Sequence, residues 1–410
     1  MKPTIYHAEK LPQGSTLAVA TLPHSECTAV SIYIPAGSRD EPHAVNGLAH
    51  FVEHMVFKGT SRRSSRDLNT EIEAIGGQIN ACTSESHTVY EASGDADALP
   101  VILDVLCDMV WHAIFPESEI PLECDVIGEE ITLYRESASD AIEDMISSAL
   151  WPQHPLGNPI TGTHESIARI DRSVLCAFRD SHHFRDDVVI AIAGPHAFDD
   201  VKALLAPHLP PHFYAVPNPP AMVDMTIDPL ESREVRETDQ LHLALAWHTP
   251  GHHSETRHAI RLLSTLLAGS ASSRLFNDLR EERGLCYQIQ SDVSFFADTG
   301  SFEISAGLDP ESREEALACI FHHIEQLVAH GPTEEELIRS QRLTITQSKL
   351  AFESTSCHAS WVGEGILNYQ IIPDVSHWRE QVLAVTSRDV QQAAALIFKG
   401  KKPAMAEIGP

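Results

Sequence analysis

Residues 76–114 read GGQINACTSESHTVYEASGDADALPVILDVLCDMVWHAI, and this stretch contains the pattern that decides the fold. GGQINACT and SHTVYEASG are two short runs that read as a pair of strands. The long apolar run that follows them, from residue 98, has the length of a helix. A strand pair followed by a covering helix is typical of α+β proteins.

The same order of elements recurs in the second half of the chain. GLCYQIQSDVSFFA (284–297) and GSFEISAGL (300–308) predict a second strand pair, and EEALACIFHHIEQLVAH (314–330) predicts the long helix after it. Upstream, strands ending at Pro35 and Pro250 each precede a predicted amphipathic helix. Self-similarity over this length indicates duplication of a whole domain. We therefore predict an α+β fold of two duplicated α/β sandwich domains, each an antiparallel-rich sheet covered by helices.

A proline-rich stretch separates the two copies. Seven prolines lie between Ala206 and Leu230. Because proline fixes its own φ and lacks a donor N–H, we expect an extended linker at 213–231. The predicted domains are therefore residues 1–212 and residues 232–410.

Composition excludes some classes of partner. The chain has 58 acidic and 29 basic residues among 410, a net charge of −29, so a basic face for nucleic acid or anionic lipid is not expected. No apolar run approaches the length of a membrane span, and the N-terminus lacks the pattern of a signal peptide. We expect a cytoplasmic protein without nucleic-acid or membrane partners.

The cysteines and five histidines of the second half do not indicate a functional site. The eight cysteines lie far apart without a C-x-x-C pair, so we expect reduced, mostly buried thiols and no cysteine-based zinc site. Five histidines of the second half are expected at the surface: His252, His253, His258, His322 and His323.

The segment GLAHFVEHMVFKGT (47–60) contains the motif H-x-x-E-H, formed by His50, Glu53 and His54. Residues four apart share one face of a helix, so both imidazoles can bind one tetrahedral zinc. Glu53 lies on the same side and can reach a zinc-bound water without being a ligand. In a chain with 24 histidines the motif arises by chance roughly 0.1 times. A pair of hydrogen-bonded helix-face histidines therefore remains an alternative at this point.

A catalytic zinc site needs a third protein ligand on another element. The predicted helix that starts near residue 117 offers Glu123, Glu129 and Glu130. Glu123 and Glu130 lie on one helical stripe, whereas Glu129 points about 100° away. We predict Glu130 as the ligand and Glu123 as a residue that supports the site without binding the metal. Exposed acids on a solvated helix face are the alternative.

With these residues the chain resembles the inverzincin peptidases of the pitrilysin family, which include insulin-degrading enzyme and the mitochondrial processing peptidase. Glu130 follows His54 by 76 positions (130 − 54), which is about the family's spacing. In that family the glutamate seven positions before the ligand supports activity without binding zinc, which corresponds to Glu123. NPITGTHESI, VVIAIAG and SSRLFNDLREERGLCYQIQ add to the likeness. The resemblance implies a zinc metalloendopeptidase with one Zn²⁺ per chain, bound by His50, His54 and Glu130, and with Glu53 as the general base.

The resemblance also implies residues that contact the substrate. An arginine and a tyrosine seven positions apart in the family's C-terminal half contact the substrate near the scissile bond, and Arg280 and Tyr287 match them. The run 78–83 resembles the family's substrate-binding edge strand, to which an extended peptide adds by main-chain hydrogen bonds. The expected contacts on this strand are Asn80, Ala81 and Thr83.

The second half lacks the metal ligands. When prolines at equivalent strand and turn ends are aligned, Thr265 and Gly269 fall near the positions of the two histidines, and Thr346 falls at that of Glu130. We therefore expect a non-catalytic copy that contributes to substrate binding.

The resemblance implies partners and leaves alternatives open. Four-domain relatives close like a clamshell around a chamber. The resemblance implies that this two-domain chain is half of such a clamshell. A homodimer would complete the clamshell, and a heterodimer is the other possibility. A non-cleaving peptide-binding or structural subunit of the same fold is the alternative function. A different zinc hydrolase with a coincidental motif and a binding module without metal are further alternatives.

Overall fold

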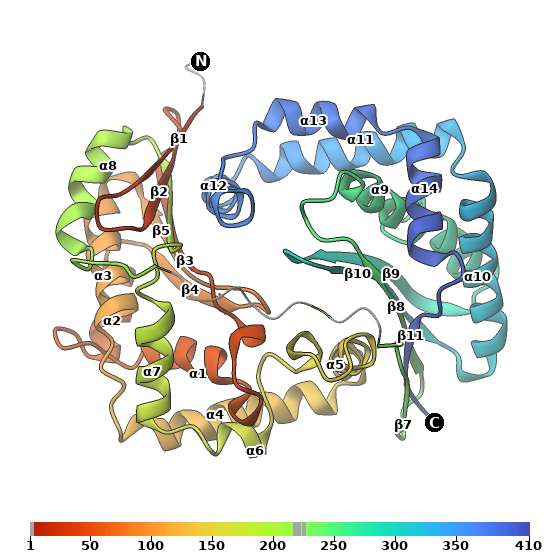
Figure 1. Ribbon diagram of the computed structural model, residues 1–410, viewed down its shortest axis with the longest axis horizontal. Helices are drawn as coiled ribbons and strands as arrows, with labels where there is room; N and C mark the ends of the chain where they lie inside the picture. The colour runs from red at the N-terminus through yellow and green to blue at the C-terminus, as the bar shows by residue number, and fades with distance from the viewer. Residues whose placement is uncertain (1–3, 216–222, 224–226) are drawn as a thin grey trace. The chain divides into compact units, whose positions relative to one another are not determined.

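The structure is a computed structural model, and it describes residues 4–215, 223 and 227–410. The chain forms two compact units (Figure 1). Unit 1 comprises Met1–Thr132, Asn158–Ala221 and Leu350–Pro373, and unit 2 comprises Leu133–Gly157, Met222–Lys349 and Asp374–Pro410. Within the linker predicted at 213–231, residues 216–222 and 224–226 lie outside the described residues.

Unit 1 is built on one sheet with helices on both faces. Its strands are β1 (Ile5–Lys10), β2 (Thr16–Thr21), β3 (Cys27–Ile34), β4 (Gln78–Thr83), β5 (Thr88–Asp95) and β6 (Val189–Gly194). Its helices are α1 (Leu48–Val56), α2 (Ser65–Ala74), α3 (Leu99–His112), α6 (His164–Ile167), α7 (Arg172–His182), α8 (Phe198–Leu205) and α12 (Thr355–Tyr369), and most of α4 (Glu119–Glu136).

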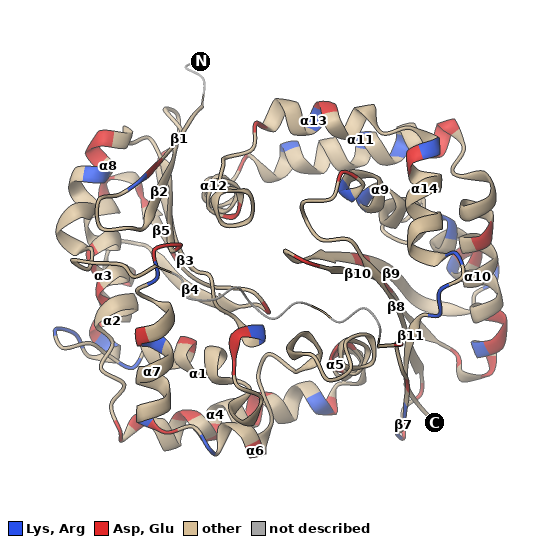
Figure 2. Ribbon diagram, in the orientation of Figure 1, with Lys and Arg blue, Asp and Glu red and all other residues tan. Residues whose placement is uncertain are grey.

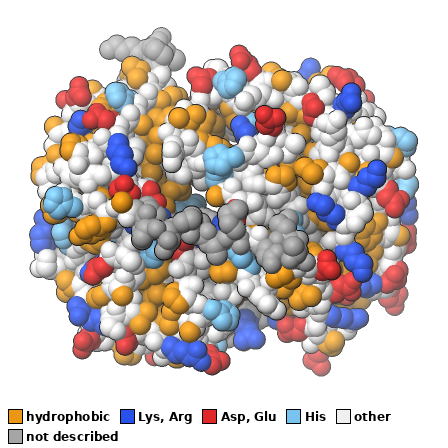
Figure 3. Space-filling model, viewed as in Figure 1, with side chains coloured by type: hydrophobic (Ala, Val, Ile, Leu, Met, Phe, Trp, Pro, Cys, Tyr) orange, Lys and Arg blue, Asp and Glu red, His pale blue; other side chains and the backbone are white. Residues whose placement is uncertain are grey.

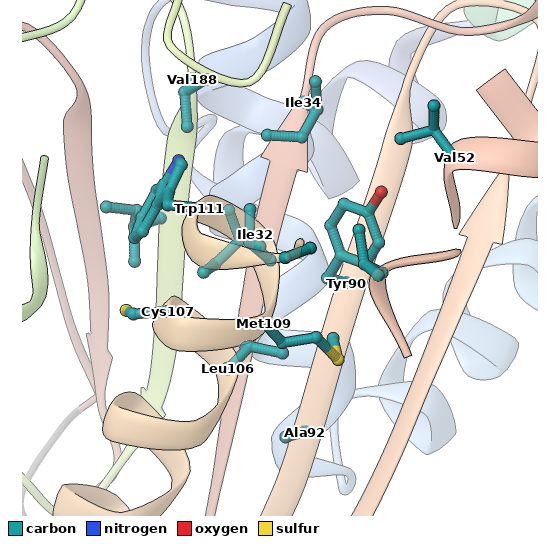
Figure 4. Close-up of a cluster of buried hydrophobic side chains, with 14 of the residues drawn as sticks. Ile32, Ile34, Val52, Tyr90, Ala92, Leu106, Cys107, Met109, Trp111 and Val188 are labelled. Carbon is teal, nitrogen blue, oxygen red and sulfur yellow. The ribbon is translucent and has the colours of Figure 1, made fainter. Parts of the chain in front are cut away.

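The sheet of unit 1 has the order β1-β2-β6-β3-β5-β4, and all its pairings are antiparallel except that of β2 with β6. The alternation of side chains sends Ile32 and Ile34 of β3 toward a core with α1 and α3, and Tyr33 toward α12. Figure 4 shows the first core, where Ile32 lies near Tyr90 of β5 and Met109 of α3. The central strands are therefore buried on both faces.

Unit 2 repeats this plan with a second sheet. Its strands are β7 (Glu231–Val235), β8 (Leu241–Thr249), β9 (Cys286–Phe295), β10 (Gly300–Leu308) and β11 (Ala404–Gly409), in the order β7-β11-β8-β10-β9. Its helices are α5 (Ala138–Leu150), α9 (Arg257–Leu267), α10 (Arg313–His330), α13 (Val375–Ala384), α14 (Ser387–Phe398) and most of α11 (Glu334–Ala351). Only β11 and β7 pair in parallel among these described strands.

Each sheet is covered on one face by a helix from the other half of the chain. Helix α12, which follows the proline-rich stretch, packs on β2, β3 and β6 of unit 1, opposite α3 (Figure 1). Helix α5, which precedes that stretch, packs on β8 and β11 of unit 2. The compact units are therefore discontinuous in sequence, and the boundaries predicted at 212 and 232 stay predictions.

The predicted fold class is confirmed: the chain is an α+β protein with two antiparallel-rich sheets covered by helices. Strands β1, β6, β7 and β11 and helices α2, α5–α8 and α12–α14 are additions to the elements that the sequence pattern predicted. No helix within the described residues is both long enough and apolar enough to cross a membrane.

The charge excess is spread over the chain. Figure 2 shows acidic residues along many helices, among them α4, α8 and α10. On the face drawn in Figure 3, acidic and basic side chains are interspersed with neutral and hydrophobic ones. The absence of nucleic-acid partners stays a prediction from net charge.

Candidate metal centre

Helix α1 carries the H-x-x-E-H motif, and its buried N-terminus fixes where the helix begins. Gly47 caps it with φ of 92°, and a β-carbon at this position would lie 2.6 Å from the carbonyl oxygen of Thr161. The buried Glu41 carboxylate accepts the backbone N–H groups of Gly47 (2.7 Å) and Ala49 (2.6 Å). An acid at a helix N-terminus satisfies orphan N–H groups and complements the helix dipole. The sequence predicted a helix over roughly 42–57; α1 is shorter because residues 43–45 form a separate 3₁₀ turn before Gly47.

The structure brings the three predicted ligands together. The imidazoles of His50 and His54 lie on one face of α1 with their ring centroids 4.5 Å apart. Glu130 of α4 places its Oε2 atom 3.8 Å from Nε2 of His50 and 3.6 Å from Nε2 of His54. One ligand atom from each residue lies within 4.8 Å of the others. Two imidazoles and a carboxylate are a donor set typical of a catalytic zinc site.

His50 indicates that this group fits a metal ion. Its ring is buried, and its Nδ1 atom has no hydrogen-bond partner among the described residues. Burial, and next His54, lower the pKa of His50 to about 3, so the ring is neutral. Metal ligation requires a neutral imidazole and would occupy Nε2, the nitrogen near Glu130, so the unpartnered Nδ1 is not the ligand atom. A hydrogen-bonded pair of helix-face histidines therefore does not describe His50.

His54 is oriented by a buried acid and a lysine. Glu123 Oε1 lies 2.7 Å from Nδ1 of His54, and Lys58 contacts the other carboxylate oxygen. Burial opposes ionisation of Glu123, but the hydrogen bonds with His54 and Lys58 outweigh it and lower the pKa of the carboxyl. An ionised Glu123 accepts the Nδ1–H of His54 and leaves Nε2 free toward Glu130.

Glu53, the predicted general base, is held by the strand beside it. The hydroxyl of Thr83, the last residue of β4, donates to Glu53 Oε2 at 2.5 Å, and the backbone of Thr83 also hydrogen-bonds this carboxylate. Burial raises the pKa of Glu53, and Thr83 opposes this shift. Glu53 is thus fixed near the ligand group by a residue whose side chain the sequence assigned to the substrate.

The predicted substrate strand is an edge strand. β4 pairs with β5 on one side and with no other described strand. Asn80 is exposed, Ala81 is partly buried and Thr83 is buried. Since the Thr83 side chain contacts Glu53, peptide binding at this edge would use the main chain of the strand.

Arg280 and Tyr287 lie in unit 2, next to one another. Arg280 belongs to the π-helical segment Phe276–Glu282, and its guanidinium lies 5.8 Å from the ring centroid of Tyr287 in β9. The side chain of Tyr287 is 74% exposed. Their contact with a substrate stays a prediction.

Sequence reasoning missed Lys58, Glu41 and the contact between Thr83 and Glu53. Lys58 follows His54 by four positions, and its charge inside an otherwise apolar segment was a usable signal. Glu41 precedes the helix that it caps, where acids are favoured. For Thr83 the sequence held no signal, because the register of β4 against α1 is a tertiary property.

The surface assignment of the second-half histidines was wrong for His252 and His258, and His323 is only partly exposed. His252 and His258 are buried, with 8% and 7% of their surface exposed. Nδ1 of His258 has no hydrogen-bond partner in the described structure, and burial lowers the pKa of this residue to about 4. His258 lies beside Trp378 and Gln381 of α13, and the ring centroid of His252 lies 4.3 Å from that of His253.

The chain was compared with known families and proteins. Residues 16–164 match the family described as "Insulinase (Peptidase family M16)", and residues 169–344 match "Peptidase M16 inactive domain". A protein of Mycobacterium tuberculosis named uncharacterized zinc protease is 32% identical, over 98% of this chain and 92% of its own length. A Bacillus subtilis protein of the same designation is 32% identical, over 86% of each chain.

Solved structures share the fold. A protease from Helicobacter pylori superposes with a TM-score of 0.93 at 20% identity, over 100% of both chains. An M16-like peptidase from Alicyclobacillus acidocaldarius gives a TM-score of 0.85 at 16% identity, over 100% of this chain and 99% of its own. From the sequence matches, this chain belongs to the insulinase family of peptidases, family M16.

Proposed function

We propose that the chain is a zinc-dependent endopeptidase that hydrolyses peptides or unfolded polypeptides. The observation that carries the proposal is the convergence of His50, His54 and Glu130, with Glu53 on the same helix as both histidines. The relatives named zinc proteases support it at the level of the family.

The metal is assigned to His50 Nε2, His54 Nε2 and a Glu130 oxygen. When bound there, zinc supplies a Lewis acid that polarises the substrate carbonyl and lowers the pKa of a water molecule. His50, His54 and Glu130 would be the protein ligands of this ion.

The chain's own residues perform the proton transfers and hold the substrate. Glu53 accepts the proton of the attacking water and then passes it to the leaving amine nitrogen. Glu123 and Lys58 keep the His54 ring in one orientation. The family resemblance assigns contacts with the substrate near the scissile bond to Arg280 and Tyr287. Main-chain hydrogen bonds along β4 would align the peptide.

The family resemblance adds two finer proposals, namely that the substrate is enclosed in a chamber and that a homodimer forms it. Light scattering coupled to gel filtration that finds a stable monomer would contradict the homodimer.

A fluorogenic peptide library, incubated with and without a chelator, tests the function. We expect internal cleavage that the chelator abolishes and added zinc restores. Cleavage that survives exhaustive chelation would overturn the metal mechanism. Zinc binding without cleavage of any library member would instead support the alternative, a non-cleaving subunit of the same fold.

A further inference from the structure

We propose that Asp278, Cys319 and His323 form a second metal site in unit 2, for a divalent cation that accepts sulfur and nitrogen ligands, such as zinc. These residues lie in the half of the chain that lacks the H-x-x-E-H ligands. The proposal does not depend on the proposed function.

The three donor atoms already converge. Asp278 Oδ2 lies 3.0 Å from Sγ of Cys319 and 2.8 Å from Nε2 of His323, and the ligand atoms all lie within 4.8 Å of one another. Bonds of about 2.3 Å to sulfur and about 2.0–2.2 Å to nitrogen and oxygen would separate such atoms by roughly 3.3–3.6 Å. Metal entry would therefore lengthen the two separations from Asp278 Oδ2 by about half an ångström.

The local structure predisposes these residues to share an ion. Cys319 and His323 are four residues apart on α10, the same helical spacing as His50 and His54 on α1. Asp278 comes from the π-helical segment Phe276–Glu282, which contacts α10. A π-helical turn is an irregular local geometry that often marks functional sites.

Asp278 is fixed through its other oxygen. Arg283 donates to Asp278 Oδ1 at 2.6 Å and to Glu315 at 2.9 Å. This leaves Oδ2 as the single oxygen that faces Cys319 and His323, as in sites where an outer partner orients a metal-binding carboxylate. Asp278 Oδ2 is thus the oxygen that lies within hydrogen-bond distance of both Cys319 and His323.

The three side chains are mostly buried, but two of them keep some contact with solvent. Cys319 is buried, whereas the side chains of Asp278 and His323 are each 18% exposed, which provides an entry path. The Cys319 thiol points to Asp278 Oδ2 in the absence of metal. On binding, this thiol releases its proton to solvent, and His323 retains one proton, at Nδ1, while Nε2 takes the ion.

Cobalt(II) substitution tests the proposal, because only a thiolate ligand gives a sulfur-to-cobalt charge-transfer band in the near ultraviolet. The His50, His54 and Glu130 group contains no sulfur, so the two sites are spectroscopically distinct. We expect wild-type protein to bind two Co²⁺ per chain and to show the band. His50→Ala/His54→Ala protein should keep one Co²⁺ and the full band.

Cys319→Ser protein should bind one Co²⁺ and lose the band. The serine hydroxyl keeps a donor to Asp278, so the fold is retained, which an unchanged thermal midpoint without metal verifies. Cys82→Ser is the matched control, because Cys82 is an exposed thiol near Glu53 in unit 1. A wild-type protein without the band, or a band lost in Cys82→Ser and kept in Cys319→Ser, overturns the proposal and leaves the cluster a hydrogen-bonded contact.

Discussion

Lys58 and Thr83 orient two side chains of α1, the proposed ligand His54 and the proposed base Glu53. Lys58 acts on His54 through Glu123, and Thr83 donates directly to Glu53. Neither Lys58 nor Thr83 is positioned as a metal ligand. Each fixes the orientation of a side chain, His54 or Glu53, whose proposed role depends on that orientation. Groups that orient metal ligands typically change affinity or activity by about 10–100-fold when they are removed.

Lys58→Met should therefore weaken zinc binding by roughly 10–100-fold while leaving the fold intact. Methionine keeps the length of the side chain but removes the charge that stabilises ionised Glu123. The measurement is competition with a chelating dye, performed on Cys319→Ser protein so that a single site contributes.

Lys202→Met serves as the control for Lys58, since Lys202 pairs with Glu9 at 2.6 Å on a more exposed surface of the same unit. An unchanged zinc affinity in the Lys58 variant would show that Glu123 orients His54 without help.

The ligands of the H-x-x-E-H site could be predicted from the sequence, whereas the cluster of Asp278, Cys319 and His323 could not. His50 and His54 could be predicted because one helical turn connects them, and Glu130 because it shares a helical stripe with Glu123. Asp278 lies 41 positions before Cys319, and no local period links them. The sequence argued against a cysteine-based zinc site because its cysteines lie far apart without a C-x-x-C pair.

At the element scale, α12 depends on a glycine. A β-carbon at Gly363 would lie 2.3 Å from a ring carbon of Tyr33 in β3, so the helix packs there without a side chain. Tyr33 is buried and belongs to a central strand. Its ring has little freedom to move aside.

We expect Gly363→Ala to destabilise unit 1 by roughly 1–3 kcal/mol through overpacking, despite the higher helix propensity of alanine. Thermal or urea unfolding provides the measurement. Gly128→Ala in α4 is the control: its added methyl would first meet His164 at 3.4 Å, so we expect a neutral or slightly stabilising effect. Equal effects of the two changes would contradict the close packing of α12.

Helix α11 begins at a charged cap. Glu336 accepts the backbone N–H of Thr333 at 2.8 Å and two hydrogen bonds from Arg274, each of 2.8 Å. Burial opposes its ionisation, but the contacts with Arg274 and Thr333 prevail and lower the pKa of Glu336 to about 2. The folded-state pKa lies below the ordinary value of 4.5, so the cap stabilises the fold above about pH 4.5 and loses this contribution as the pH falls toward 2.

Glu336→Gln should accordingly cost about 1–2 kcal/mol at neutral pH. The difference from wild type should shrink as denaturant unfolding is repeated at pH values below 4.5. The neighbouring Glu335→Gln is the control, because its side chain is 91% exposed and approaches Arg339 only to 3.9 Å. A difference between Glu336→Gln and wild type that is independent of pH would rule out an ionised cap.

Helices and strands with a clear local pattern could be predicted from the sequence, whereas the sheet on which a helix packs could not. The strand pairs and long helices of both halves follow from the period of their apolar residues. That α5 packs on the sheet of unit 2 and α12 on that of unit 1 depends on contacts between segments from opposite sides of the proline-rich stretch. Nothing in either helix's own residues specifies which sheet it covers.

At the scale of the whole molecule, the two halves have the same plan and different chemistry. Unit 1 contains the H-x-x-E-H group, and unit 2 contains Arg280, Tyr287 and the second cluster of ligands. Duplication of a fold followed by divergence of its sites explains why one sheet architecture occurs twice with different functional residues. The central claim, hydrolysis with Glu53 as the base, concerns unit 1 and is tested by one substitution.

Zinc content and peptide cleavage of Glu53→Gln protein, measured on one sample beside wild type and Glu129→Gln, provide the most direct test. Glu129 is an exposed acid next to Glu130, so its variant controls for a change in charge near the site. The account predicts that Glu53→Gln keeps the zinc content of wild type and loses cleavage by at least about 10²-fold, whereas Glu129→Gln keeps both. Undiminished cleavage in Glu53→Gln would contradict Glu53 as the base and, with it, the mechanism proposed for this chain.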